Sequence, residues 1–248
     1  MMGRDSFFTL PRRHGLMLPP PKPRHTTNSN HRYHKWKNLI KGFTPLAANQ
    51  LWVSDITYIT LDNGDVGYLH LITDAYSRAI VGWELVDTLR ASITIKALEQ
   101  AIGQAGGGSL EGLVHHSDRG VQYCCDDYVS ILKKHRIKIS MTEDYNPTDN
   151  AIAERVNGII KTEAVYSRKS FNGIEHARNV IGRFIHFYNY HRPHMGIGYK
   201  IPAVVHVETG PQKKMWKKKI YPEKPYSNGN NEITLQRRTT RTGSCSPI

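Results

Sequence analysis

The chain has 248 residues, 39% of them hydrophobic, and this length suits one substantial domain with extensions or two small domains. Its formal net charge of +13 is concentrated at the two ends. Residues 1–44 contain nine basic residues (Lys or Arg) and one acidic residue. Residues 45–204 contain 16 basic and 17 acidic residues, and residues 205–248 contain nine basic and three acidic residues. We therefore expect a nearly neutral folded core between two basic arms that contact a polyanion, with nucleic acid as the partner. The alternative is that the arms only aid solubility.

The cysteines and the apolar runs exclude several classes of protein. Cys124 and Cys125 are adjacent, and the three cysteines form neither a disulfide framework nor a C-x-x-C metal knuckle. No run approaches 18 apolar residues, and the start lacks the apolar segment of a signal peptide. We expect a cytoplasmic protein in a reducing compartment, with no membrane partner.

The predicted elements begin after residues 1–44, a polar, Pro-rich and basic arm or linker with little that could form a core. Asp62-Asn63-Gly64 is a hairpin turn signal. Runs of β-branched and aromatic residues predict strands over 51–60, 67–73, 79–86, 113–118 and 137–141. Helical spacing of apolar residues predicts helices over 92–105, 126–135 and 173–190, and another around Glu154. This order predicts an α/β layered domain with a mixed sheet.

The helix around Glu154 carries a carboxylate away from its apolar stripe. Asn150 ends a polar turn, and Ile152, Val156 and Ile159 then recur at helical spacing. At about 100° per residue, Glu154 lies roughly 200° from Ile152, so we expect it, with Asn157 and Lys161, to face outward. Such a face could hold a metal and contact a phosphate. The alternative is a solvated surface glutamate.

Two further acids stand where active sites are commonly built. Asp55 lies within the first predicted strand, and Asp118 ends the fourth. A buried, unpaired carboxylate costs several kcal/mol unless something compensates its charge. If the first and fourth strands are neighbours, the two acids converge, and a divalent cation relieves their repulsion. Ligands made only of oxygen suit Mg²⁺ or Mn²⁺, and such a site favours in-line phosphoryl transfer.

The sequence segments around these acids resemble those of a known protein family. They are Trp52-Val53-Ser54-Asp55-Ile56-Thr57-Tyr58, His115-His116-Ser117-Asp118-Arg119-Gly120-Val121-Gln122-Tyr123, and Asp149-Asn150-Ala151-Ile152-Ala153-Glu154 with Lys161-Thr162-Glu163. They resemble the three signature blocks of the integrase catalytic core, and more narrowly the transposases that bacterial insertion sequences encode in a second reading frame. The 35 residues between Asp118 and Glu154 match that family's spacing, and residues 187–194 with 198–203 resemble its closing block.

The resemblance implies an RNase H-like fold with a five-stranded mixed sheet flanked by helices. It also implies that Asp55, Asp118 and Glu154 hold two Mg²⁺ (or Mn²⁺) ions and catalyse cleavage at the ends of the element, followed by strand transfer into target DNA. It divides the chain into a basic arm (1–44), a catalytic core (45–207) and a basic tail (208–248) that we expect to be disordered. Implied partners are DNA, further copies of the chain, and a helix-turn-helix protein from the upstream frame. The implied location is the bacterial cytoplasm, in association with the nucleoid.

Several other residues are candidates with two interpretations each. DNA-contact candidates are Lys161, Asn150, Arg119 and Arg155; for Asn150 we favour the interpretation as a helix cap. His115 and His116 place a proton or a phosphate, or are structural, and the structural interpretation is preferred. Arg192 and His194 are expected to anchor the closing helix by hydrogen bonds, with DNA contact as the alternative; for Lys161 the alternative is a solvated surface lysine.

Competing functions remain open from the sequence. A retroviral-type zinc module fails because no cysteine precedes Cys124. An inactive or truncated remnant that only binds DNA is the main alternative, since no segment before Leu51 has a helix-turn-helix pattern.

Overall fold

The computed structural model describes residues 9, 13–14, 29–62, 64–143, 150–167 and 171–212. Its centre is a five-stranded sheet with the strand order β3-β2-β1-β4-β5. The strands are β1 (Leu51–Thr60), β2 (Val66–Asp74), β3 (Ile80–Val86), β4 (Val114–Ser117) and β5 (Lys138–Met141). The first three pair antiparallel, whereas β1 with β4 and β4 with β5 pair parallel, so the sheet is mixed as predicted.

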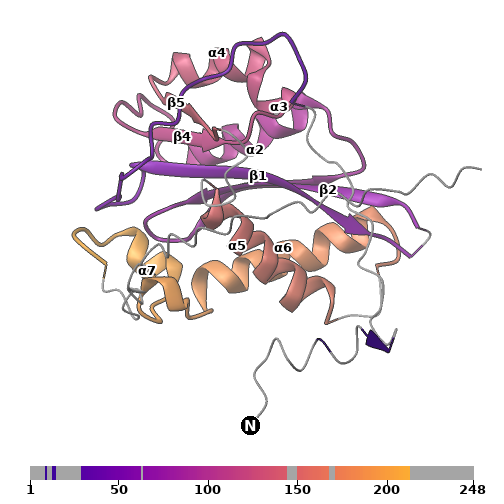
Figure 1. Cartoon of the computed structure of the whole chain (residues 1–248). Helices are drawn as coiled ribbons and strands as arrows, with labels where there is room; N and C mark the ends of the chain where they lie inside the picture. Colours follow the sequence, from indigo (N-terminus) through magenta and orange to yellow (C-terminus); the bar gives the residue numbers. More distant parts are fainter. Residues whose placement is uncertain are drawn as a thin grey trace, which may run out of the picture. The chain divides into compact units, whose positions relative to one another are not determined.

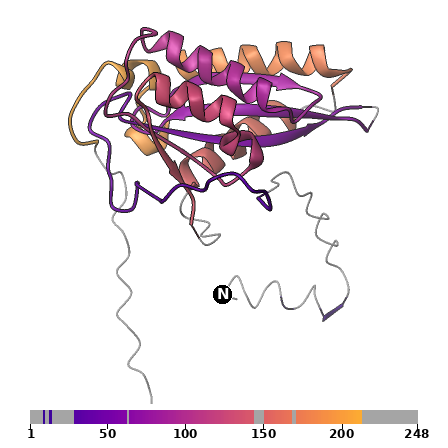
Figure 2. The ribbon, with the colours of Figure 1, turned by 90° about the horizontal axis from the view of Figure 1, so that it is seen from above.

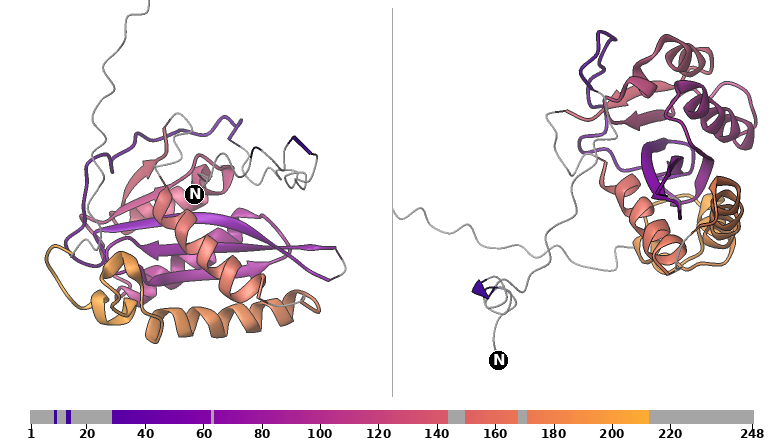
Figure 3. Two further views of the ribbon diagram at one scale, coloured as in Figure 1. Left: turned by 60° about the horizontal axis from the view of Figure 1, so that its bottom comes forward. Right: turned by 90° about the vertical axis from the view of Figure 1, so that its right-hand side faces the viewer.

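Helices cover both faces of the sheet (Figure 1). One face carries α2 (Ala91–Gln104), α3 (Val121–Cys124) and α4 (Asp126–Lys134). Figure 2 shows this layer from above. The other face carries α5 (Ala151–Ile160), its π-helical continuation η1 (Lys161–Val165) and α6 (Ile174–Tyr190). Figure 3 shows α5 crossing the strands on that side, with the short η2 (Met195–Ile197) and α7 (Pro202–His206) following α6.

Two main apolar cores result, one on each side of the sheet. The first joins residues of the sheet such as Trp52 and Ile139 to α2, α3 and α4. The second joins residues such as Ile59 and Leu71 to α5, η1 and α6. Because side chains of a strand alternate between faces, the odd-numbered residues of β1 from Val53 to Ile59 lie on the α5 side. Burying apolar area on both faces is the principal stabilisation of such a sheet.

Close approach of α2 to the edge strand depends on Gly82 of β3. A Cβ atom added at Gly82 would lie 2.1 Å from the carbonyl oxygen of Ala97, so only glycine fits without displacing the helix. The amide of Asn189 covers the neighbouring edge, accepting from Ile80 N and donating to Ile80 O, both at 2.9 Å. The free edge of β3 is therefore partly closed by a side chain of α6.

The predicted strands and the four predicted helices are confirmed to within a few residues. The sequence patterns missed α3, η2 and α7, each of which is five residues or shorter. Asn63 of the predicted turn lies outside the described residues, as does the tail after residue 212, so its predicted disorder stays a prediction. The boundaries at residues 44 and 207 also stay predictions. Part of the basic arm, residues 31–41, contacts the sheet through side chains and backbone.

Candidate active site

Asp55 projects from the middle of the central strand toward α5. It shares the face of Val53, and its side chain is only partly buried. Its Oδ1 accepts from Ile56 N at 2.9 Å, and its Oδ2 accepts from the side-chain amide of Asn157 at 2.7 Å. The strand therefore fixes the backbone of this acid, and α5 fixes its side chain.

Asp118 lies beside Asp55 because β1 and β4 are parallel neighbours. The register pairs Val53 with His116, and each acid follows its paired residue by two positions. Asp118 stands immediately after the last residue of β4, and its Oδ1 accepts from Gly120 N at 2.9 Å. The sequence-based expectation that these two acids converge if their strands are neighbours is therefore met.

Glu154 stands in the first turn of α5 and its side chain is exposed, as the helical spacing predicts. Asn157 differs from the prediction, because it is buried at 6% exposure rather than facing outward. It lies one helical turn beyond the buried Ala153, on the side of α5 that packs against β1. The amide therefore faces the acid of the strand, while the glutamate remains open to solvent.

The three acids interact electrostatically. Burial, then the negative charge of Asp118 and, with a smaller effect, that of Glu154 raise the pKa of Asp55 from 3.8 to about 7. The Ile56 N–H and the Asn157 amide act in the opposite direction. A carboxyl group whose pKa is raised to about 7 and that lies beside a second acid is typical of a functional site.

Lys161 lies seven residues after Glu154, at the start of the π-helical turn η1 that continues α5. Its Nζ lies 4.4 Å from the centre of the Tyr58 ring, which is a cation–π contact with β1. Burial lowers the pKa of Lys161, and the charge of Asp55 opposes this shift. The lysine is thus near the acids, as the sequence suggested, and single π-helical turns are frequent at functional sites.

A buried polar cluster lies behind the two strand acids. His115 Nε2 is 3.1 Å from Ser54 Oγ and 2.9 Å from Tyr128 OH. Burial lowers the pKa of His115 to about 3, so the ring is neutral and contributes no charge. Burial, and then the charges of Asp118 and Asp55, raise the pKa of Tyr123, which keeps its hydroxyl protonated. These buried groups pack beneath β1 and β4, on the side of the sheet that carries α3 and α4.

The other DNA-contact candidates are Asn150, Arg155 and Arg119, and they differ in burial and in hydrogen bonding. Asn150 occupies the N-cap position but makes no capping bond with its side chain; its amide instead donates to Ser54 O at 3.0 Å, so the cap interpretation is wrong. The side chain is buried against β1, which draws it away from the helix end. Arg155 is exposed, and Arg119 is half-buried beside Asp118.

Both histidines at the strand end are buried, and His116 Nδ1 lies 2.8 Å from Ser140 Oγ, which fits the structural interpretation. Arg192 donates from Nε to Glu163 at 2.8 Å and from Nη2 to its second oxygen. His194 Nδ1 accepts from Gly196 N at 3.0 Å and caps η2. The anchoring role expected for Arg192 is met, whereas the side-chain hydrogen bond of His194 is local to η2 and does not join the closing helix to another element.

Sequence reasoning missed how closely Asn157 and Tyr58 belong to this site. Asn157 was expected beside Glu154 on an outward face that could hold a metal, and not as the hydrogen-bond partner of Asp55; Tyr58 was assigned only to a strand. Spacing could have found only Asn157, which lies one helical turn from Glu154; it gives no signal for Tyr58, because residues three apart in a strand lie on opposite faces.

The oxygen donors of this site suit a hard divalent cation. The raised pKa of Asp55 also fits, because a cation beside Asp55 and Asp118 would relieve the repulsion that holds a proton there. Among the residues that the structure describes, however, no three His, Cys, Asp or Glu side chains are grouped so that they could hold a metal ion. The two strand acids lie together, and Glu154 stands apart from them as an exposed side chain.

The architecture matches solved integrase cores. The HTLV-2 integrase catalytic core domain in complex with magnesium aligns with a TM-score of 0.51 at 21% identity, over 66% of this chain and 99% of that one. The simian T-cell lymphotropic virus intasome in complex with a PP2A regulatory subunit aligns with a TM-score of 0.55 at 20% identity, over 79% and 66%. The sheet order, the helices on both faces and these alignments define an RNase H-like fold of the integrase-core class.

Relatives in sequence narrow the class. Models of the integrase core domain match residues 45–147 and 135–202. The chain is 37% identical to the insertion element IS600 31 kDa protein of Shigella sonnei, over 82% of this chain and 74% of that protein. It is 34% identical to the putative transposase for IS986/IS6110 of Mycobacterium tuberculosis, over 74% and 66%, and 32% identical to transposase InsF for IS3A of Escherichia coli, over 65% and 56%. The chain belongs to the integrase-core family of insertion-sequence transposases.

The chain spans 66% and 56% of the length of the last two of these relatives. No helix among the described residues is long and apolar enough to cross a lipid bilayer.

Proposed function

We propose that this chain is the catalytic part of a transposase that cleaves DNA at the ends of an insertion sequence and joins the freed 3′-hydroxyl to target DNA. Family membership makes it a polynucleotidyl transferase in general terms. The observation that carries the finer proposal is the pair of acids on neighbouring parallel strands, Asp55 and Asp118, with Glu154 on the helix that packs beside them.

Asp55, Asp118 and Glu154 would hold the divalent cation, Mg²⁺ or Mn²⁺. When bound, such a cation activates the attacking hydroxyl and stabilises the leaving oxygen of an in-line displacement. Two ions are the expectation for this chemistry, and Glu154 must approach the strand acids for all three to share a cation. Its exposed position on the first turn of α5 leaves it free of packing that would prevent this.

The chain's own residues supply positioning and charge. Asn157 orients one oxygen of Asp55 through the 2.7 Å hydrogen bond, which leaves the side chain pointing between β1 and α5. Lys161, packed on Tyr58, supplies a positive charge for a phosphate beside the scissile bond. Arg119 and Arg155 supply further positive charge at the strand end and on the outward face of α5. The partly apolar surroundings that raise the pKa of Asp55 also strengthen these interactions.

The partners follow from this activity. DNA is the substrate, both as the element ends and as the target. A homo-oligomer on DNA is expected, and a helix-turn-helix protein from an upstream frame is expected to recognise the element ends. The simian intasome aligned above is an assembled complex, which supports the proposal of multimers on DNA.

A DNA-binding remnant without activity is the second candidate. It is favoured by one observation: the third acid does not join the other two in a metal-binding group among the described residues. Under this alternative the same basic residues bind DNA, but no cleavage or joining follows.

Asp118→Asn distinguishes the two candidates. With oligonucleotides that carry the element ends, and with Mg²⁺, wild type is expected to join strands, whereas Asp118→Asn is expected to lose joining by at least a thousandfold. The change removes one negative charge and few contacts, so affinity for duplex DNA should stay within about twofold of wild type. Joining by the variant at the wild-type rate would reject the metal-site assignment. A wild type that binds DNA and never cuts it, even with its upstream frame supplied, would favour the remnant.

A further inference from the structure

A short segment that precedes the catalytic core lies along the free edge of the sheet. Residues 31–41, here called the strap, run beside β5, which is the last strand of the sheet. Lys37 O accepts from Met141 N at 3.4 Å, and Leu39 N donates to Ser140 Oγ at 2.8 Å. The strap therefore pairs with an edge that would otherwise be open.

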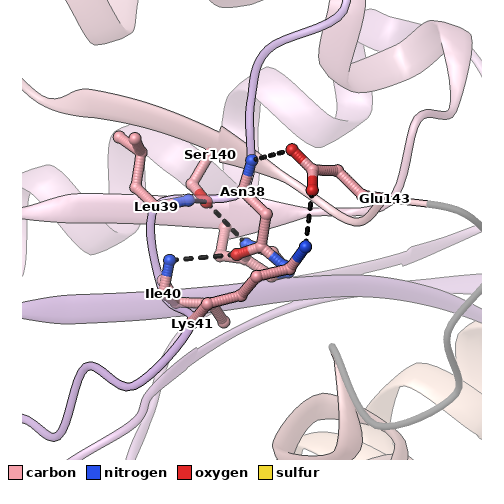
Figure 4. Close-up of polar contacts among 7 residues, drawn as sticks. Asn38, Leu39, Ile40, Lys41, Ser140 and Glu143 are labelled. Atoms are coloured by element: carbon pink, nitrogen blue, oxygen red, sulfur yellow. Dashed lines mark hydrogen bonds and ion pairs between the residues drawn. The ribbon is translucent and has the colours of Figure 1, made fainter.

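Glu143 holds the strap in place just beyond β5 (Figure 4). Its Oε1 accepts from Asn38 N at 2.9 Å, and its Oε2 is 2.7 Å from Lys41 Nζ. The backbone N–H of Asn38 and then the Lys41 ammonium lower the pKa of Glu143. The side chain of Asn38 in turn accepts from Ile40 N at 2.9 Å. Two hydrogen bonds to one carboxylate fix the middle of the strap relative to the strand.

Side chains of the strap alternate between core and solvent. Trp36 and Ile40 are partly buried and pack against two of the apolar clusters, and Asn38 between them is also partly buried. The residues between these are exposed: Lys35, Lys37, Leu39 and Lys41. At about 3.3 Å per residue in an extended chain, charges two positions apart lie roughly 7 Å apart. The strap therefore presents a row of positive charges along the edge of the sheet.

The end of this row lies beside the proposed active site. His31 Nε2 donates to the carbonyl of Arg119 at 2.9 Å, and Arg119 is the neighbour of Asp118. Burial raises the pKa of the Cys124 thiol to about 11, and the positive charges of Lys35 and Arg119 both oppose this shift. Arg32 and Tyr33 are exposed between His31 and Lys35.

Most of these cations form no ion pair with the acidic residues that the structure describes. Lys41 is paired with Glu143, but none of the ion pairs found among the described residues involves Arg32, Lys35 or Lys37. The proposed active site beside them is acidic, and its carboxylates repel a phosphate backbone. A row of unpaired cations next to such a site lowers this repulsion for an approaching polyanion.

We propose that the outer face of the strap, formed by Arg32, Lys35 and Lys37, binds the phosphate backbone of duplex DNA and directs it toward Asp55 and Asp118. This inference rests on the proposed function, which makes DNA the substrate, and adds where the duplex contacts the chain. The strap is a surface for backbone contacts rather than for base recognition, because ammonium and guanidinium groups on phosphates carry no sequence information.

The test is the salt dependence of binding to a duplex of unrelated sequence. The variant Arg32→Gln/Lys35→Gln/Lys37→Gln removes three charges from the strap. The matched control Lys96→Gln/Lys133→Gln/Arg183→Gln removes three exposed charges from α2, α4 and α6. If each strap cation contacts one phosphate, the slope of log affinity against log salt becomes shallower by up to ~2.7, and affinity at 0.1 M salt falls on the order of 100-fold. The control is expected to keep nearly the wild-type slope.

A second readout separates direct contact from a general effect of charge. A photo-crosslinking p-benzoylphenylalanine at position 37 is expected to join the duplex, and the same group at position 133 is not. Equal slopes for the two triple variants, or equal crosslinking at the two positions, would overturn the proposal. Both measurements use binding alone, so they give an answer even if wild type proves unable to join strands. Conversely, loss of joining in Asp118→Asn supports the proposed function whatever the strap does.

Discussion

Asp55 is the residue on which the proposed chemistry of this site depends. It lies on a central strand, its two oxygens accept hydrogen bonds from a backbone N–H and from Asn157, and Asp118 lies beside it. Such an arrangement is unfavourable for an ionised carboxylate without a cation. The residue therefore keeps a proton to about pH 7 in the metal-free chain, and a divalent cation would displace that proton.

Asp55→Asn is expected to change the pH dependence of stability in the absence of divalent cations. The folded chain holds the Asp55 proton up to about pH 7, whereas an unperturbed aspartate releases it near 3.8. The free energy of unfolding of wild type therefore falls as pH rises between these values. The neutral variant lacks this loss, so its stability relative to wild type should increase between pH 4 and pH 8 by on the order of 2–4 kcal/mol. Urea denaturation in EDTA measures the difference.

Comparing Asp55→Asn with wild type removes the effect of other buried groups on the pH dependence of stability. Burial lowers the pKa values of His70 to about 4, His115 to about 3 and His194 to about 4, so these groups reduce stability as pH falls below their ordinary value of 6.5. They are common to both proteins and cancel. The substitution also keeps the contact with Asn157, whose buried Oδ1 has no hydrogen-bond partner among the described residues and can accept after an amide flip. A stability difference that stays constant from pH 4 to pH 8 would contradict the assignment.

Among the elements, the end of α6 fixes the extension of α5. Arg192, stacked on the ring of Tyr188 at 5.8 Å, holds Glu163 of η1 with two hydrogen bonds. The hydroxyl of Tyr188 donates to Arg78 O at 3.0 Å in the turn between β2 and β3. The closing block of the sequence thus connects the edge strand of the sheet to the turn that carries Lys161. Its role in the structure is to set the position of η1.

A double-mutant cycle measures that connection. Arg192→Ala and Glu163→Ala are each expected to destabilise the chain, and their coupling is expected to be about 1 kcal/mol, because the bidentate geometry strengthens a pair that is still partly exposed. The matched control is the pair of Lys200 and Glu208, which is more exposed and should couple by less than half as much. Chemical denaturation of the six variants and wild type gives both couplings. Additive effects for Arg192 and Glu163 would show that the pair does not connect the two elements.

On the scale of the whole molecule, periodic patterns were sufficient for the sheet and the long helices. The β-branched and aromatic run in 51–60 predicted the central strand, and the apolar stripe from Ile152 to Ile160 predicted the helix and the outward face of Glu154. Short elements such as α3 and α7 were missed, because four or five residues contain too little periodicity to recognise. The proximity of Asp55 and Asp118 depended on strand order, which the sequence left conditional.

Polar partners and the strap could not be predicted from patterns. Asn150 has the composition of a helix cap, yet its amide donates to Ser54 across the interface between α5 and β1. The strap lies in a segment that is rich in proline and basic residues, and contacts with Ser140, Met141 and Glu143, about a hundred residues later, give it a fixed place. Contacts between residues so far apart in sequence depend on tertiary structure, and local propensity does not encode them.

The central claim is that Asp55, Asp118 and Glu154 share a divalent cation. Titration of the full chain with Mn²⁺, followed by the electron paramagnetic resonance signal of the free ion, tests it without relying on catalysis. Asp55→Asn, Asp118→Asn and Glu154→Gln are each expected to weaken binding by at least about tenfold, because each removes a charged oxygen ligand. The exposed Glu99→Gln on α2 serves as the matched control and should bind like wild type. Wild-type affinity in Glu154→Gln, or affinities in all three variants equal to that of Glu99→Gln, would contradict the shared site.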